Sequence, residues 1–282
     1  MRIGLITPDP GHPVLAATAA LLAGDGHTVE VSDPRAGAAA APAGAPADVY
    51  LLKARTASAL ELARELERRG APVLNSAAAT ARCQDRTGMA GSARRAGLPF
   101  AATRTFEAAA RLESAPGLPW PMVVKSRHSR KADLVARVDD PAGLRELASA
   151  WADEPVVVQA FAPNNGWDHK VWVVGDRVFA GLRRSELAPA DGAPERCGVR
   201  LPDAWADLAL RVGAAFDLDV YGVDFVDTGA AGPLIVDVNA FPGIRDQPGA
   251  PEALAALALD RAARAARLPA ARGRRQSGVG RP

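Results

Sequence analysis

The chain has 282 residues, of which 48% are hydrophobic and 23% are charged, a balance that is ordinary for a soluble enzyme. The formal net charge is only +2, so nothing favours bulk nucleic-acid binding, and no apolar run is long enough to span a membrane. Since the N-terminus shows no signal peptide, we expect a cytoplasmic protein with no nucleic-acid or membrane partner.

Residues 1–80 alternate short apolar runs with helical segments. Such βαβ alternation predicts a small parallel α/β domain. Ser58 is the expected cap of the second helix, and an Ala/Pro/Gly-rich stretch at residues 36–47 is expected to be a loop. The expected strands are residues 2–7, 27–31, 48–53 and 71–74, and the expected helices are residues 14–22 and 58–69.

Lysine usage is informative, because only four of the 34 basic residues are lysines. Lys53, Lys125, Lys131 and Lys170 all fall at strand ends or in loops, where a compact point charge can do what a planar guanidinium cannot. Lys53 and Arg55 lie at the carboxyl end of the third expected strand, the edge at which open α/β sheets usually bind ligands. A solvated strand end explains the same pattern, and the sequence leaves both interpretations open.

The middle of the chain contains a second candidate for anion binding. An apolar strand at residues 120–125 ends on Lys125 and is followed by a polar, basic loop at residues 126–132. A lysine in this position is suited to hold phosphate. His128 in the loop is either solvated or a contact to substrate or phosphate. Further expected elements are helices at residues 84–96 and 141–151 and strands at residues 133–138 and 155–159.

The last third of the chain opens with a hairpin at residues 168–180, marked by the turn Gly175-Asp176. Arg183 and Arg184 follow its second strand. Residues 269–282 are basic and lack apolar periodicity, which predicts a disordered tail. The expected helices are residues 202–216 and 252–266. Cys83 and Cys197 show no metal-ligand spacing and are expected to be free thiols.

Two apolar strands near the C-terminus carry polar residues that suit a metal. Asp237 and Asn239 are two apart on one strand, so they share a face, and Asp224 lies within the preceding strand. A buried carboxylate is costly unless something pairs with it, and oxygen ligands of this kind suit Mg²⁺. The alternative is that Asp237 caps a turn and Asn239 satisfies local backbone.

Taken in order, these motifs resemble those of the ATP-grasp superfamily. They comprise a lysine ending a strand, Val-Val-Val-Gln at residues 156–159, Lys-Val-Trp-Val-Val-Gly-Asp at residues 170–176, and Gly-Val-Asp at residues 222–224. Val-Asp-Val-Asn-Ala-Phe-Pro-Gly follows at residues 236–243. The resemblance covers about residues 1–260.

The resemblance implies an α/β fold that becomes α+β in the ATP-binding part. A small N-terminal parallel α/β domain would precede two α+β segments that clasp ATP. The implied divisions are an N-terminal domain at residues 1–80, a central segment at 81–158, a C-terminal segment with the magnesium site at 159–268, and the tail at 269–282.

The resemblance also implies roles for individual residues. Asp224, Asp237 and Asn239 match the family's ligands for Mg²⁺, with Mn²⁺ as an alternative ion. Arg183 or Arg184 would stabilise an acyl phosphate and a tetrahedral intermediate. The implied ATP contacts are Arg86, Lys125, Gln159, Ala160, Phe161 and Lys170, and the implied substrate contacts are Lys53, His128, Lys131 and Gly243.

Two branches of the superfamily compete as the closer resemblance. RimK-like carboxylate–amine ligases join an amino acid or peptide through an acyl phosphate, and we place them first because they are the commoner bacterial type. Inositol trisphosphate 5/6-kinases are the alternative, because Arg86 replaces a lysine and Lys170 replaces an arginine of the RimK-like pattern. A nucleotide-binding protein without catalysis is the second alternative. The implied partners are a small carboxylate or other anionic substrate and an amine, and a homo-oligomer is compatible with the family.

Overall fold

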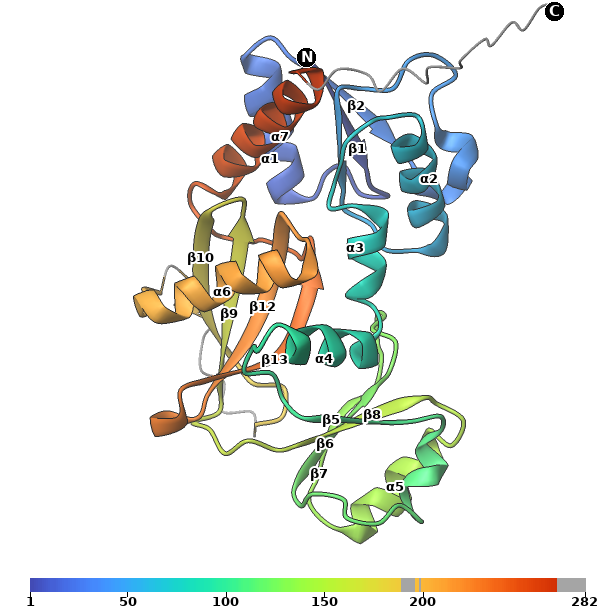
Figure 1. Cartoon of the computed structure of the whole chain (residues 1–282), viewed down its shortest axis with the longest axis vertical. Coiled ribbons are helices and arrows are strands. Elements are labelled where there is room, and N and C mark those ends of the chain that lie inside the picture. Colours follow the sequence, from blue (N-terminus) through green and yellow to red (C-terminus); the bar gives the residue numbers. More distant parts are fainter. Residues whose placement is uncertain (189–195, 198, 268–282) are drawn as a thin grey trace, which may run out of the picture.

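The computed structural model describes residues 1–188, 196–197 and 199–267. Three β-sheets follow one another along the long axis of the molecule (Figure 1). The N-terminal sheet lies at the top of that view, a five-stranded sheet lies in the middle, and a four-stranded sheet lies below it. The predicted α/β fold with an α+β lower part is confirmed, and the tail predicted at residues 269–282 lies outside the described residues.

The N-terminal sheet is parallel, with the strand order β2-β1-β3-β4. Its strands are mostly buried apolar runs connected by helices, as the βαβ alternation predicts. The 3₁₀ helix η1 replaces part of the loop predicted at residues 36–47. The elements are β1 (Arg2–Ile6), α1 (Pro13–Gly24), β2 (Thr28–Ser32), η1 (Pro34–Ala40), β3 (Val49–Leu52), α2 (Ala57–Arg68) and β4 (Val73–Leu74).

The expectation that Ser58 caps α2 is wrong. The helix begins at Ala57, and the hydroxyl of Thr56 accepts the hydrogen bond from the amide of Ala59 at 3.2 Å. Thr56 has the extended backbone conformation that an N-cap residue requires, whereas Ser58 lies within the first helical turn. Two candidate hydroxyls two residues apart cannot be ranked from the sequence alone.

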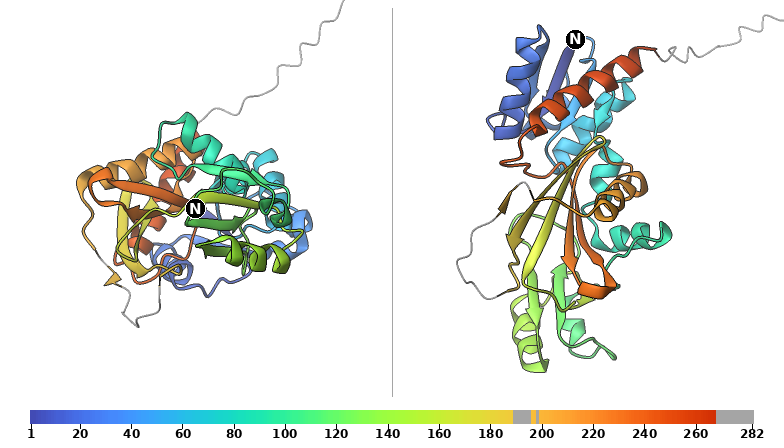
Figure 2. Two further views of the ribbon diagram at one scale, coloured as in Figure 1. Left: turned by 90° about the horizontal axis from the view of Figure 1, so that it is seen from below. Right: turned by 90° about the vertical axis from the view of Figure 1, so that its left-hand side faces the viewer.

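The last helix of the chain returns to the N-terminal sheet. Helix α7 (Ala250–Arg267) buries Leu254 and Ala258 in the same apolar cluster as Leu15 and Leu22 of α1. Figures 1 and 2 show α7 beside α1 at the end of the molecule that carries β1 and β2. The N-terminal layer is therefore built from both ends of the described chain, and the domain boundaries given above remain predictions.

Asn75, which follows β4, connects the N-terminal layer to the middle sheet through side-chain hydrogen bonds. Its side chain is completely buried. Its amide nitrogen donates to the carbonyl of Val220 at 2.6 Å, and its oxygen accepts from the amides of Asp219 at 2.8 Å and Val220 at 2.9 Å. One side chain thus satisfies three backbone groups at the start of a central strand.

Replacing Asn75 with alanine is expected to lower the free energy of unfolding by about 2–4 kcal/mol, because the three backbone groups lose their partner inside the protein. Urea denaturation followed by circular dichroism measures this. The matched control is Asn165→Ala, which removes one hydrogen bond from an exposed loop and should cost less than about 1 kcal/mol. An equal decrease in the free energy of unfolding in the two variants would contradict the role of Asn75 in joining the two layers.

The lower sheet is antiparallel, with the strand order β5-β8-β6-β7. Three of its strands were predicted, but β5 was not, because it is a half-exposed edge strand in a stretch that reads as loop. Helix α3 was also missed. The elements are α3 (Ala77–Arg82), α4 (Arg86–Arg95), β5 (Thr103–Phe106), η2 (Ala109–Leu112), β6 (Met122–Ser126), β7 (Val135–Val138), α5 (Pro141–Ala150) and β8 (Val156–Ala160).

The middle sheet is antiparallel, with the strand order β11-β10-β9-β12-β13. The predicted hairpin at residues 168–180 is its β9–β10 pair. Helix α6 covers one face, where Val212 and Phe216 pack against Val223 and Phe225. The elements are β9 (Trp167–Val174), β10 (Arg177–Arg184), β11 (Arg196–Cys197), α6 (Asp203–Phe216), β12 (Val220–Asp227), η3 (Gly229–Ala231) and β13 (Pro233–Ala240).

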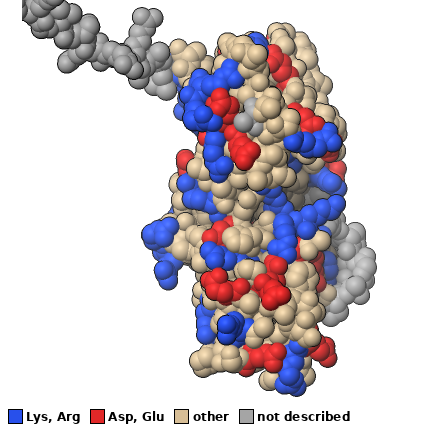
Figure 3. All heavy atoms as spheres, turned by 90° about the vertical axis from the view of Figure 1, so that its right-hand side faces the viewer, with Lys and Arg blue, Asp and Glu red and all other residues tan. Residues whose placement is uncertain are grey.

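The cysteines, the hydropathy of the helices and the surface charge also bear on the sequence predictions. Cys83 is a buried free thiol, as predicted, while the side chain of Cys197 lies outside the described part. None of the described helices combines the length and the hydropathy needed to cross a bilayer. On the face shown in Figure 3, basic and acidic side chains are interspersed along the molecule rather than gathered into one basic surface.

Candidate functional site

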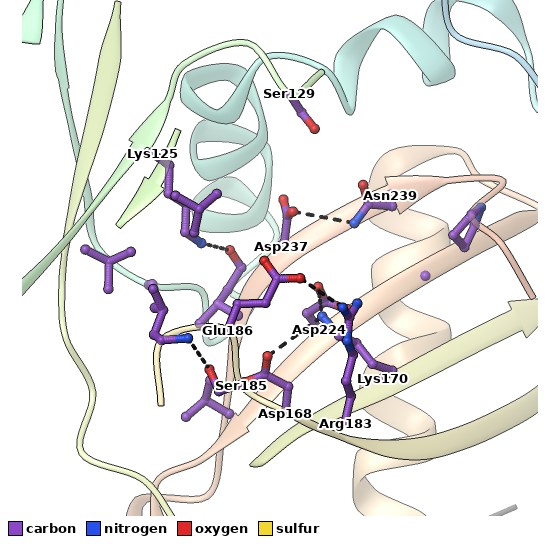
Figure 4. A pocket seen from close by; sticks show the side chains of 18 of the residues that line it. Lys125, Ser129, Asp168, Lys170, Arg183, Ser185, Glu186, Asp224, Asp237 and Asn239 are labelled. Atoms are coloured by element: carbon purple, nitrogen blue, oxygen red, sulfur yellow. Dashed lines mark hydrogen bonds and ion pairs between the residues drawn. The ribbon is translucent and has the colours of Figure 1, made fainter. Parts of the chain in front are cut away.

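A cavity of ≈ 800 Å³ lies between the lower sheet and the uncovered face of the middle sheet. Because side chains alternate along a strand, Asp168, Lys170 and Trp172 of β9 all line it, while Val171 and Val173 pack beneath α6. The same alternation brings Asp224 of β12 and Asp237 of β13 to its wall. Polar groups therefore converge on one space between the two sheets (Figure 4).

The three predicted metal ligands come together in this cavity. Asp224 and Asp237 are directly opposite each other in the β12–β13 ladder, and their side chains are 19% and 16% exposed. Asn239 places its amide nitrogen 3.5 Å from the Oδ2 atom of Asp237, and the assignment of amide nitrogen and oxygen can be exchanged. Two carboxylates and one amide oxygen suit Mg²⁺, which takes its remaining ligands from water and phosphate.

Lys170 is held between carboxylates. Its ammonium donates to Asp224 at 2.6 Å and lies 3.9 Å from Asp168. Burial alone would lower the pKa of Lys170, but the attraction of Asp224 and the hydrogen bond to it outweigh burial and raise this pKa. Burial raises the pKa of Asp168, and the nearby charge of Asp224 adds to that effect. Lys170 is thus a fixed cation beside the candidate metal ligands.

Arg86 is a second fixed cation. It is the first residue of α4, only 5% exposed, and its Nη1 atom donates to the carbonyl of Ser126 and to Asp133, both at 2.7 Å. Its Nη2 atom lies 3.6 Å from Asp237. Its Nε atom is buried and has no hydrogen-bond partner among the described residues. A buried N–H without a partner beside the cavity is compatible with a phosphate oxygen as its missing acceptor.

Lys125 is the third cation and is also deeply buried. It lies near the end of β6 with 7% of its surface exposed, and its ammonium donates to the carbonyl of Val236 at 2.9 Å. Burial lowers the pKa of Lys125, and the charge of Asp237 only partly offsets this. An ammonium kept inside the protein at such a cost is typical of a functional site.

The predicted adenine hinge lies along the lower-sheet wall of the same cavity. Gln159, Ala160 and Phe161 all line it. The side-chain amide of Gln159 donates to Thr103 at 3.0 Å, and the guanidinium of Arg137 stacks on the ring of Phe161, 4.2 Å from its centroid. Strand β8 pairs with β5 only as far as Gln159, so Ala160 is the first residue whose edge on that side is not covered by β5.

Four predicted residues do not line the cavity. Arg184 points the other way from Arg183 because the two are neighbours on β10, and it lines a separate hollow beside the ring of Trp167. Lys53 donates instead to the carbonyls of Phe241 and Pro242 at 3.3 and 3.1 Å. His128 and Lys131 lie in the loop and are not part of the wall. Among the predicted substrate residues, Gly243 does line the cavity.

The basic loop at residues 126–132 is largely neutralised from within the protein. Arg127 pairs with Asp85 at 3.1 Å, and Arg130 pairs with Glu154 at 2.6 Å. One partner precedes the loop and the other follows it, both at a long distance along the chain, so the sequence gives no sign of the pairing. Two arginines of the loop are therefore paired within the protein, and one of them, Arg130, also lines the cavity.

Sequence reasoning missed several residues of the cavity wall. Asp168 was detectable, because it is two residues before Lys170 on a strand that was predicted correctly, and so shares its face. Asp133 and Arg245 were not detectable, since their roles depend on loops that meet only in the folded chain. Within the described residues, no group of three or more His, Cys, Asp or Glu side chains is arranged to hold a metal by itself.

Comparison with known proteins identifies a family. A family model described as a RimK-like ATP-grasp domain matches residues 100–248, more than half of the chain. A protein of Rhodopirellula baltica named "Probable alpha-L-glutamate ligase" is 35% identical over 95 residues, which are 32% of this chain and 23% of that protein. A protein of the same name from Pasteurella multocida is 35% identical over 99 residues, 33% of this chain and 31% of that protein. The matched segment thus spans less than a third of each of these relatives.

Solved structures share the whole fold. The RimK domain ATP-grasp protein of Sphaerobacter thermophilus superposes with a TM-score of 0.74 at 22% identity, covering 92% of this chain and all of that one. The D-alanine–D-alanine ligase of Bacillus anthracis superposes with a TM-score of 0.70 at 16% identity, covering 94% of this chain and 98% of that one. At these identities the likeness establishes the fold.

Proposed function

The chain belongs to the RimK-like ATP-grasp family, and we propose that it is an ATP- and Mg²⁺-dependent ligase that joins a carboxylate to an amine through an acyl phosphate. The observation that carries the proposal is the meeting of three largely buried cations with three oxygen ligands at one cavity. Phosphoryl transfer depends mainly on positioning and on neutralising charge, and this cavity supplies both.

The residues divide into three groups along the cavity. Gln159, Ala160 and Phe161 would hold the adenine end of ATP. The phosphates would lie between the fixed cations, and bound Mg²⁺ would neutralise phosphate charge that the protein leaves uncompensated. The cations are Arg86, Lys125 and Lys170, and the ion would be held by Asp224, Asp237 and Asn239.

The reaction proceeds in two displacements. An oxygen of the substrate carboxylate attacks the γ-phosphorus of ATP, so that a carbon–oxygen–phosphorus linkage forms and ADP leaves. The amine then attacks the acyl carbon, an amide bond forms, phosphate leaves, and the amine releases a proton. Arg183 lines the cavity and pairs with Glu186 at 3.0 Å, and in this proposal it stabilises the negative charge of the acyl phosphate.

The names of the curated relatives favour ligation over phosphorylation of a hydroxyl group. Two relatives in the matched region are named as glutamate ligases. Replacement of the family lysine by Arg86 does not remove the cation, because Arg86 still reaches within 3.6 Å of Asp237. The replacement at Arg86, one of the two features that favour a kinase, is therefore compatible with a ligase.

The test is a screen for ADP release with Mg²⁺-ATP and hydroxylamine, against pooled amino acids, other carboxylic acids and inositol phosphates. Hydroxylamine traps acyl phosphates as hydroxamates, so we expect ADP and a hydroxamate with at least one carboxylate pool. ADP accompanied by a phosphate ester and no hydroxamate would contradict the proposal and make the protein a kinase. Tight ATP binding without ADP release in any pool would make it a non-catalytic nucleotide-binding protein.

A further inference from the structure

The turn after β13 forms part of the cavity wall, at the end of the cavity nearest the N-terminal sheet. Pro242, Gly243 and Arg245 of this turn line the cavity. Lys53 follows the carboxyl end of β3. Its ammonium donates to the carbonyls of Phe241 and Pro242 and so fixes the turn. This is the edge of the parallel sheet at which ligands usually bind, here brought against the ATP-grasp cavity.

Two side-chain nitrogen atoms, from His12 and Arg245, lie beside Gly243. A Cβ atom at this position would lie 3.6 Å from Nε2 of His12 and 4.0 Å from Nε of Arg245, with no other side chain or distant backbone of the described residues within 4 Å. His12 precedes α1, and its Nδ1 atom is buried without a hydrogen-bond partner among the described residues. A space flanked by ring and guanidinium nitrogens is suited to an acceptor of hydrogen bonds.

Two cations, Lys53 and Arg245, and one carboxylate, Asp9, act on His12, and Asp246 lines the cavity next to Arg245. Burial lowers the pKa of Lys53 to about 8, and the charge of Arg245 contributes. Burial is also the main cause that lowers the pKa of His12, and the charges of Lys53 and Arg245 add to it. The charge of the exposed carboxylate Asp9 raises the pKa of both His12 and Lys53, but less than burial lowers it. Repulsion between neighbouring cations is relieved when an anion binds among them.

We propose that the space beside Gly243 binds an oxyanion of the acceptor substrate, a carboxylate or phosphate group, held between the imidazole of His12 and the guanidinium of Arg245. Lys53 acts as a positioning residue that fixes the turn and adds positive charge. The inference rests on the proposed function, because it assigns the anion to the acceptor of that reaction. Asn239 and Gly243 line the same cavity, so an acceptor anchored here extends toward the phosphate-binding residues.

The site can be tested without ATP and without knowing the substrate. Four histidines are present in the chain, so the ring signals can be followed by nuclear magnetic resonance, with His12 identified by a His12→Gln variant. Glutarate and inorganic phosphate are titrated separately into the full-length protein. We expect a saturable shift of the His12 signal. The probe that binds more tightly identifies the anion as carboxylate or phosphate.

Two variants make the test specific. Arg245→Gln removes the exposed cation, and Gly243→Ala fills the space at a residue whose backbone lies outside the left-handed region. Each should weaken the probe's binding about tenfold or more. Arg211→Gln, at an exposed residue of α6 away from the cavity wall, should bind like wild type. In turnover assays, Arg245→Gln should raise the KM for the acceptor and leave the KM for ATP unchanged.

Two results would overturn the inference. One is a His12 signal that does not move with either probe, and the other is a shift that is equal in wild type and Arg245→Gln. Failure of the ligase proposal gives a different pattern, because a protein that forms no hydroxamate can still show the His12 titration. Failure of the anion-site inference would conversely leave hydroxamate formation by the wild-type protein intact.

Discussion

Replacing Asp237 with asparagine is expected to reduce ADP formation by about 10²–10³-fold. The substitution keeps the size of the side chain and the oxygen that accepts from the amide of Val238 at 3.2 Å, but it removes one of two carboxylates facing the cavity from β12 and β13. The substitution also removes the negative charge that pairs with Arg86 and that favours the protonated form of Lys125. The rate of ADP release with saturating Mg²⁺-ATP measures the effect.

The control for this variant is Asp227→Asn, the same chemical change on the neighbouring strand β12. Asp227 accepts from the amide of Gly229 at 2.9 Å and is not part of the cavity wall. It should retain wild-type turnover, and both variants should keep the circular dichroism spectrum of the folded protein. Near-normal turnover in a folded Asp237→Asn protein would refute the metal assignment.

Replacing Lys125 with methionine is expected to separate stability from activity. Methionine fills a similar volume without a charge, so the proposed contact between ammonium and phosphate is lost and turnover should fall about a hundredfold or more. Burial lowers the pKa of Lys125 in the folded state, which means that the protonated lysine destabilises the fold below that pKa and that stability rises as pH increases through it. At neutral pH the variant should therefore unfold at the same temperature as wild type or higher.

Thermal unfolding and ADP release measured on the same preparations decide this prediction. The control is Arg94→Met, which removes an exposed cation of α4 away from the cavity wall and should change neither quantity appreciably. A large fall in the unfolding temperature of Lys125→Met would show that Lys125 is a structural residue. Unchanged turnover would contradict its proposed contact with phosphate.

The middle sheet could be predicted from the sequence because local patterns determine it. The alternation along β13 places Asp237 and Asn239 on one face whatever else the chain does, and the Gly175-Asp176 turn fixes the register of β9 and β10. The same reasoning extends to Asp168, which the alternation of β9 brings to the cavity. Local periodicity thus accounts for the sheet face that carries the candidate metal ligands.

The remainder depends on which segments meet in space, and the sequence does not report that. Arg130 of the basic loop pairs with Glu154, and Arg127 pairs with Asp85, which are partners far from the loop in the sequence. The apolar pattern of α7 predicts a helix but not that it packs against α1. The grouping of His12 with Arg245 joins segments from opposite ends of the chain, so only the folded protein reveals it.

The central claim is that a substrate carboxylate attacks the γ-phosphate of ATP at this cavity. The most direct test uses the carboxylate found in the hydroxylamine screen, labelled with ¹⁸O in both carboxyl oxygens, together with Mg²⁺-ATP and an amine. Attack by the carboxylate predicts that each released phosphate carries one ¹⁸O atom and that the amide retains the other. Released phosphate without ¹⁸O would contradict the claim, because the oxygen would then have come from water.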